Sequence, residues 1–150
     1  MNEKISRTKY GEKYILRAVF NKVLCFIAML PIGSKIKIFL YSLAGVRIGK
    51  NCFIASYVLI DDQYPELITI EDNVTIAYRA ALITHDDSRK IVSAITLKKK
   101  SWIGSCAIIL PGVIVGENAV VGAGATITKD VLPKTTVISA MVRVINKVDK

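Results

Sequence analysis

A six-residue repeat runs through the last two-thirds of this chain and constrains its fold more than any other feature. Aliphatic residues recur at one position of the repeat: Ile48, Ile54, Ile60, Ile70, Ile76, Leu82, Ile103, Ile109, Val115, Val121 and Ile127. The next residue is usually small or acidic, as in Gly49 and Gly104. Glycine recurs without helical phase, which excludes a helix. A period of six predicts a solenoid of short parallel strands whose stacked coils share one core.

Two breaks interrupt the period, and loops that interrupt a regular stack often carry function. Between Ile60 and Ile70 there is a four-residue insertion that includes residues 64–66. The larger break, between Leu82 and Ile103, contains His85, the only histidine in the chain. An imidazole with a pKa of about 6.5 is suited to removing a proton from a hydroxyl group. The alternative is a solvated loop histidine without a catalytic role.

The first 45 residues have a different pattern and are expected to form a separate helical segment. Apolar residues at helical spacing predict a helix that Pro31 and Gly33 end, followed by a shorter helix over residues 34–43. The longest uninterrupted apolar run, Val23 to Leu30, is far below the roughly 20 residues needed to span a bilayer. The expected domains are residues 1–45, a basic amphipathic helical segment, and residues 46–150, the repeat domain.

The charge distribution indicates a partner for the helical segment. The net charge is +9, and residues 1–50 hold ten of the 21 basic residues but only two of the 12 acidic ones. Basic residues interleaved with aromatics, as on a nucleic-acid-binding face, are not found, so no nucleic-acid partner is expected. A basic and apolar N-terminal segment is typical of contact with an anionic membrane surface. Packing against the repeat or a partner subunit stays open as the alternative.

The cysteines indicate the compartment. There are three, Cys25, Cys52 and Cys106, without a CxxC motif, so they are expected to be unpaired thiols in a reducing environment. No signal peptide is recognised at the N-terminus. We therefore expect a cytoplasmic protein that is peripheral at the inner face of the cytoplasmic membrane.

The hexads of residues 46–147 resemble those of the hexapeptide-repeat acyltransferases. The stretch SWIGSCAIILPGVIVGENAVVGAGATITKDVLP, residues 101–133, is similar to the branch of sugar and polysaccharide O-acetyltransferases that act on maltose, galactosides and colanic acid. The resemblance implies a mainly β fold, a left-handed parallel β-helix of about four coils preceded by the amphipathic helical segment. It also implies a homotrimer, acetyl-CoA as co-substrate without a metal, and a sugar acceptor.

The same resemblance implies site residues. His85 would be the general base, in a cleft between two subunits. Its second ring nitrogen needs an orienting partner, for which Asp86 and Asp87 are candidates by proximity and a backbone carbonyl is the alternative. Asp61 and Asp62 match an acceptor-binding acid. The residues that match positions near the coenzyme, including small residues expected to expose backbone amides in a groove between coils, are Trp102, Gly104, Ser105, Gly122, Ala123, Gly124, Thr128, Lys129 and Arg143.

The C-terminal region departs from the family pattern. Relatives commonly have Gly-Asn-Pro-Ala-Lys-Val-Ile where this chain has SAMVRVI, residues 139–145. Arg143 keeps the basic position, but the glycine and proline of the turn are lost. The departure lies where coenzyme phosphate contacts are expected and leaves the expected fold unchanged.

The sequence favours an acetyl-CoA-dependent O-acetyltransferase that acts on a sugar hydroxyl of a cell-surface polysaccharide precursor. A helical segment that binds the membrane would fit a lipid-linked precursor. Two alternatives stay open: N-acetylation of an amino sugar or O-acetylation of serine, and a non-catalytic trimeric scaffold at the membrane. A zinc carbonic anhydrase is excluded because it needs three histidine ligands for each metal. A nucleotidyltransferase is excluded because the chain has no room for its second domain.

Overall fold

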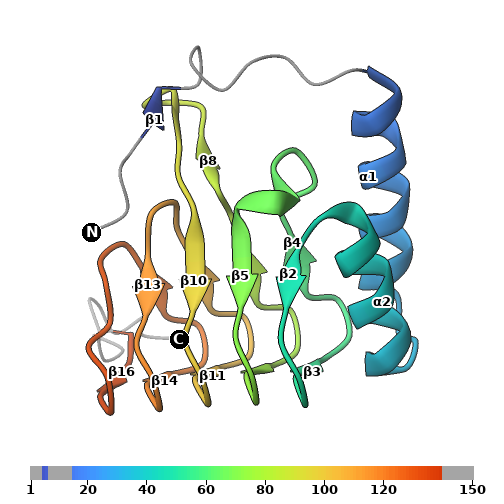
Figure 1. The fold of residues 1–150 in the computed structure, drawn as a ribbon. Helices are drawn as coiled ribbons and strands as arrows, with labels where there is room; N and C mark the ends of the chain where they lie inside the picture. The colour runs from blue at the N-terminus through green and yellow to red at the C-terminus, as the bar shows by residue number, and fades with distance from the viewer. Residues whose placement is uncertain (1–4, 7–14, 140–150) are drawn as a thin grey trace, which may run out of the picture.

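The structure, a computed structural model, describes residues 5–6 and 15–139 of the 150-residue chain. Two helices lie at one end of a stack of short parallel strands (Figure 1). The helices are α1, Ile15–Met29, and α2, Ser34–Ala44, as the sequence predicts. Helix α2 ends at Gly45, whose positive φ of 115° lets the next amide, that of Val46, return to the carbonyl of Tyr41.

The strands form four coils of three strands each. The first coil contains β2 (Arg47–Ile48), β3 (Phe53–Ile54) and β4 (Leu59–Ile60). The second contains β5 (Ile68–Ile70), β6 (Thr75–Ile76) and β7 (Ala81–Leu82). The third contains β10 (Ile95–Leu97), β11 (Trp102–Ile103) and β12 (Ile108–Ile109). The fourth contains β13 (Ile114–Val115), β14 (Val120–Val121) and β15 (Thr126–Ile127), and β16 (Thr136–Val137) begins an incomplete fifth coil.

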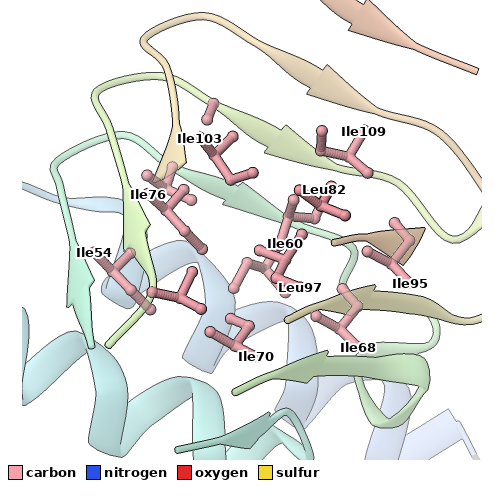
Figure 2. Close-up of a cluster of buried hydrophobic side chains, with 14 of the residues drawn as sticks. Ile54, Ile60, Ile68, Ile70, Ile76, Leu82, Ile95, Leu97, Ile103 and Ile109 are labelled. Carbon is pink, nitrogen blue, oxygen red and sulfur yellow. The ribbon is translucent and has the colours of Figure 1, made fainter. Parts of the chain in front are cut away.

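Equivalent strands of successive coils pair in parallel and form three sheets, with orders β13-β10-β5-β2, β16-β14-β11-β6-β3 and β15-β12-β7-β4. We name them the β2 sheet, the β3 sheet and the β4 sheet. The hexad aliphatics are in register, so that Ile54 lies beside Ile76 and Ile60 beside Leu82. Their side chains stack in columns inside the coils (Figure 2) and are buried, except that Ile48 is half-buried. The predicted solenoid of about four coils is confirmed.

The second break in the repeat is shorter than the spacing of the hexads predicts. Ile95 and Leu97 are buried on β10 and pair with Ile68 and Ile70, so the coil resumes well before Ile103. Residues 83–94 leave the coil and form an antiparallel pair, β8 (His85–Asp86) with β9 (Ile91–Val92). Strand β1 (Ile5–Ser6) adds to β9 (Figure 1). Leu97 does keep the period, because it lies six residues before Ile103, but three lysines follow it and hide the pattern.

Corners of successive coils line up into edges, two of which matter for function. Between the β4 and β2 sheets lies the loop edge, which holds residues 61–67, 83–94, 110–113 and 128–130. Both inserted loops, including the short helix η2 (Pro65–Leu67), project from it at the top of Figure 1. Between the β3 and β4 sheets lies the tight edge, which holds residues 55–58, 77–80, 104–107 and 122–125.

Helix α2 caps the first coil, whose outer backbone groups have no preceding coil to bond. Lys37 Nζ donates to the carbonyl oxygen of Ala55 at 3.0 Å, and the hydroxyl of Tyr41 donates to the carbonyl oxygen of Val58 at 2.7 Å. Lys37 and Tyr41 are buried. Burial lowers the pKa of the Lys37 ammonium. Because buried backbone groups left unpaired are costly, these contacts tie α2 to the stability of the solenoid.

Helix α1 turns an apolar face outward. One side packs inward through Leu24, Cys25 and Ala28. The outward face carries exposed apolar side chains at helical spacing: Leu16, Val19, Phe20, Val23, Phe26 and Ile27. Leu30, directly after the helix, is exposed as well. Within the part of the chain that the structure describes, neither helix is long and apolar enough to cross a bilayer.

Candidate functional site

The coil register brings His85 together with an acid that precedes it by 24 residues. Strands β4 and β7 pair so that Ile60 lies beside Leu82, and the residues that follow these two therefore meet at the loop edge. Asp61 Oδ2 lies 2.6 Å from His85 Nδ1. The side chain of Asp61 is 1% exposed, whereas that of His85 is 21% exposed. The acid is therefore buried behind an imidazole that reaches solvent.

Four protein groups hold the Asp61 carboxylate in place. Oδ2 accepts hydrogen bonds from the Thr84 amide at 2.9 Å and the Thr84 hydroxyl at 2.6 Å, in addition to its contact with His85. Oδ1 accepts from the Gln63 amide at 2.9 Å. Burial acts to raise the pKa of Asp61, but the hydrogen bonds from Thr84, His85 and Gln63 outweigh it and leave that pKa below its usual value. Asp61 is therefore a buried, ionised carboxylate at neutral pH.

The carboxylate decides which ring nitrogen of His85 can act as a base. An ionised carboxylate only accepts hydrogen bonds, so the Nδ1 position of His85 must carry the proton that Asp61 receives. In the neutral imidazole the lone pair then belongs to Nε2. The ring of Tyr64 packs edge-on to the imidazole, with centroids 6.2 Å apart. Asp61 and Tyr64 therefore fix the orientation of a potential base.

Neither acid that follows His85 in the sequence is the partner of Nδ1, so the prediction for Asp86 is wrong. Asp86 Oδ1 instead accepts from the amide and hydroxyl of Ser88, at 2.9 Å and 2.6 Å, and from the Arg89 amide at 3.1 Å. It stabilises the turn between β8 and β9. The physical reason is the alternation of side chains along a strand, which sends residues 85 and 86 of β8 to opposite faces. Asp87 is an exposed residue of the same turn.

A cleft of about 350 Å³ lies between α1 and β4, and His85 forms part of its wall. The residues that line it are Lys22, Cys25, Phe26, Met29, Val58, Leu59, Ile60, Asp61, Asp62, Ile83 and His85. The oxygens of Asp61 face Thr84, His85 and Gln63, which makes it the partner of His85, and its contact with the acceptor stays a prediction. Asp62 is half-buried in the lining, and its role in acceptor binding stays a prediction.

The residues predicted to lie near the coenzyme occupy three regions of the described chain. Thr128 and Lys129 are exposed on the loop edge after the fourth coil, whereas His85 follows the second coil. Trp102 projects from the β3 sheet and is 50% exposed. The others lie on the tight edge: Gly104, Ser105, Gly122, Ala123 and Gly124. Arg143 lies outside the described residues.

Three of the tight-edge glycines do not expose free amides, contrary to the sequence analysis. The amide of Gly104 donates to Val121, that of Gly122 to Val137, and that of Gly124 to Ser105. These bonds join successive coils, as ladder bonds do in a sheet. A Cβ on Gly104 would lie 2.6 Å from the amide nitrogen of Ala123, so glycine is required there for coil stacking. In the corner formed by residues 122–125, Ala123 and Gly124 are exposed.

Sequence reasoning missed the Asp61–Thr84–His85 arrangement and the contribution of α1 to the cleft. The signal for the first was present in the hexads. Stacking Leu82 on Ile60 places Asp61 next to the loop that follows Leu82, which includes Thr84 and His85. The α1 wall had no such signal, because the docking of a helix on a solenoid does not follow from the repeat. No group of three His, Cys, Asp or Glu side chains that could hold a metal ion is found in the described ranges.

Comparison with known proteins agrees with this architecture. The family "Bacterial transferase hexapeptide (six repeats)" matches residues 94–129. Galactoside O-acetyltransferase of Escherichia coli is 35% identical over 115 residues, which cover 71% of this chain and 56% of that protein. "Putative acetyltransferase YvoF" of Bacillus subtilis is 30% identical over 119 residues, which cover 77% of this chain and 69% of that protein. The chain thus spans little more than half of the galactoside enzyme.

A solved structure shows the same fold over nearly the whole chain. The hexapeptide-repeat acetyltransferase VCA0836 of Vibrio cholerae, solved with acetyl-CoA, has a TM-score of 0.69 at 22% identity, covering 97% of this chain and 100% of that chain. This likeness confirms the left-handed parallel β-helix that the hexads led us to expect. From the coiled hexads and from its relation to YvoF, the chain belongs to the hexapeptide-repeat transferase family.

Proposed function

We propose that this chain is an acetyl-CoA-dependent O-acetyltransferase that acts on a sugar hydroxyl, with His85 as the general base. One observation carries the proposal: His85 is held by buried, ionised Asp61 at 2.6 Å and also lines a cleft. A histidine with a merely structural role does not need both features. The arrangement is that of a base with an orienting acid, which hydroxyl activation requires.

The proposed reaction is a direct transfer. Nε2 of His85 accepts the proton of the acceptor hydroxyl as its oxygen attacks the carbonyl carbon of the thioester. The ionised carboxylate of Asp61 stabilises the imidazolium that forms. The tetrahedral intermediate then collapses, the carbon–sulfur bond breaks, and the imidazolium returns its proton to the leaving thiolate. The products are an acetyl ester and free coenzyme A, and no cysteine or serine nucleophile is needed.

The comparisons support both substrates. One relative is a galactoside O-acetyltransferase, and one structural neighbour was solved with acetyl-CoA. We place acetyl-CoA near the residues that the family resemblance selects. The corner formed by exposed Ala123 and Gly124 supports this placement, together with exposed Trp102, Thr128 and Lys129. The acceptor hydroxyl would then lie in the cleft beside His85.

We further propose a homotrimer. The predicted coenzyme residues of the tight edge and the His85 pair of the loop edge lie on different edges of the same prism. Packing of three prisms around a threefold axis would bring the tight edge of one chain next to the loop edge of another. The exposed side chains of Phe53, Trp102 and Val120 along the β3 sheet support such an interface, because apolar patches of this kind usually contact a partner.

We also propose that the outward face of α1 rests on the cytoplasmic face of a membrane, where precursors of surface polysaccharides would be acetylated. Exposed Val19, Phe20 and Val23 support this, together with Arg17 and Lys22 on the same helix. Deletion of residues 1–44 is a poor test, because it removes the α2 cap. Val19→Asp combined with Val23→Asp keeps the cap, and it should abolish sedimentation with vesicles that contain anionic lipid. Sedimentation equal to that of the unaltered chain would refute membrane binding.

The experiment that tests the enzymatic function compares the unaltered chain with His85→Ala. Each is incubated with acetyl-CoA and with methyl galactoside, methyl glucoside, glucosamine or serine. Turnover is followed by loss of thioester absorbance, because exposed Cys106 would consume a thiol reagent. We expect O-acetylation of a glycoside that His85→Ala reduces by at least about a hundredfold. Acetylation of serine alone, or of the amino group of glucosamine alone, would refute a sugar hydroxyl as the acceptor. A folded chain that neither binds nor consumes acetyl-CoA would refute the enzymatic function and favour a non-catalytic scaffold.

A further inference from the structure

We propose that the cleft between α1 and β4 is the acceptor subsite and that it takes an amphiphilic acceptor. This would be a sugar that carries an alkyl or polyprenyl-like chain next to the acetylated ring. The inference rests on the proposed function, since it assigns the acceptor of that reaction. It goes further by making α1 a part of substrate recognition.

The first argument is the polarity of the lining. His85, Asp61 and Asp62 come from the loop edge and form one part of the cleft. Helix α1 and strand β4 supply the opposing walls, which are mostly apolar and include Phe26, Met29 and Leu59. Apart from Lys22 and the thiol of Cys25 on α1, these walls carry no polar side chain. A free sugar that filled the cleft would therefore leave hydroxyl groups without hydrogen-bond partners, which is costly. An acceptor with one polar and one apolar part matches both the polar part of the cleft and its apolar walls.

The second argument is the continuity of the cleft with the surface. The side chain of Phe26 lines the cleft, and the residue is also 62% exposed. It belongs to the outward apolar face of α1, together with Val19 and Val23. A chain that leaves the cleft past Phe26 therefore stays in contact with apolar side chains. A helix that served only to cap the solenoid would have no reason to present such a path.

The third argument is size. A volume of about 350 Å³ is at the lower end of the range for small-molecule sites, roughly 300–1,000 Å³. The cleft can therefore enclose only part of a large acceptor. A sugar ring beside His85 and the first few methylene groups beside Phe26 and Met29 would fill it. The rest of the chain would extend over α1.

The test compares methyl and octyl forms of the same glycoside, with the octyl form below its critical micelle concentration. Three proteins are measured: the unaltered chain, Phe26→Ser in the cleft, and Phe39→Ser, a matched control on α2 that is 66% exposed and does not line the cleft. We expect the unaltered chain to prefer the octyl acceptor by about tenfold or more in kcat/KM, through a lower KM. Phe26→Ser should reduce this preference to near unity, and Phe39→Ser should retain it.

The possible outcomes separate this inference from the proposed function. Equal kcat/KM for both glycosides in the unaltered chain would overturn the amphiphilic acceptor while leaving the transferase intact. Equal loss of the preference in both variants would also overturn it, since the effect would then come from general surface hydrophobicity. If no glycoside is acetylated, the proposed function fails. Saturation-transfer NMR with octyl glycoside alone then tests whether the cleft binds the acceptor. Transfer signals that are lost in Phe26→Ser and retained in Phe39→Ser would support the cleft as the binding site. Any other pattern would refute it.

Discussion

Replacement of Asp61 by asparagine is the sharpest test of the proposed catalytic pair. The Asp61 carboxylate receives four hydrogen bonds, and three of them end on Oδ2. Asparagine can keep its oxygen at the Oδ2 position and retain the bond from His85. Its amide group must then face the amide of Gln63, which is also a donor. The substitution thus removes the negative charge and opposes two donors, while the shape of the side chain is nearly unchanged.

The magnitude follows from the bond that the charge strengthens. A hydrogen bond to a charged partner contributes about 1.5–3 kcal/mol. In the reaction the carboxylate charge stabilises His85 as it becomes an imidazolium. Removal of that charge, with the hydrogen bond kept as a neutral one, therefore raises the barrier by about that amount. Because about 1.36 kcal/mol changes a rate tenfold, kcat should fall roughly tenfold to a hundredfold. The opposed donors at Gln63 should in addition lower the free energy of unfolding by about 1–3 kcal/mol.

The assay is thioester consumption with the best glycoside acceptor, beside Asp86→Asn as a matched control. Asp86 is the sequence neighbour of His85, but its carboxylate bonds Ser88 and Arg89 in the β8–β9 turn. We expect Asp86→Asn to keep kcat within about twofold. Equal losses in the two variants, or full activity in Asp61→Asn, would show that the buried carboxylate does not support the base.

Three further predictions concern stability, measured by urea unfolding at one protein concentration. Tyr41→Phe leaves the carbonyl of Val58 without its 2.7 Å donor and should cost about 1–3 kcal/mol; an unchanged midpoint would contradict the cap. Gly104→Ala places a Cβ 2.6 Å from the Ala123 amide nitrogen and should cost about 1–3 kcal/mol, which native-like stability would contradict. The folded-state pKa of Asp61 lies below its unfolded value of about 3.9, so its stabilisation is present above that pH and is lost as pH falls through the folded pKa. The free energy of unfolding should therefore fall more steeply in acid for the unaltered chain than for Asp61→Asn, and parallel curves would refute this.

The sequence was sufficient to predict the coils because the repeat encodes them locally. Each hexad places one aliphatic residue inward, and those residues form the buried columns of Figure 2 together with Ile68, Ile95 and Leu97. The two helices were also predictable, since Pro31 and Gly33 separate them and Gly45 ends the second. Leu97 was missed although it keeps the period, because the lysines after it resemble a solvent-exposed loop.

The site was less predictable because proximity in sequence is a poor guide in a solenoid. Asp86 is adjacent to His85 along the chain but points away from it, whereas Asp61 lies one coil earlier and meets it. A search one coil before His85, rather than among its sequence neighbours, would have found the partner. The tight-edge glycines illustrate the opposite error. Their small size was interpreted as access for coenzyme, but the close approach of Gly104 to Ala123 shows that coil packing alone requires it.

The side chains of the two N-terminal helices require different explanations. Capping explains α2, because Lys37 and Tyr41 bond backbone carbonyls that no preceding coil can reach. Capping does not explain α1, whose inward side already packs while a row of apolar side chains faces outward. Stability alone would favour polar residues there, since exposed apolar area gives no folding free energy. A ligand or surface that covers these residues accounts for them, and the position of Phe26 between the outward face and the cleft of His85 connects that role to the acceptor.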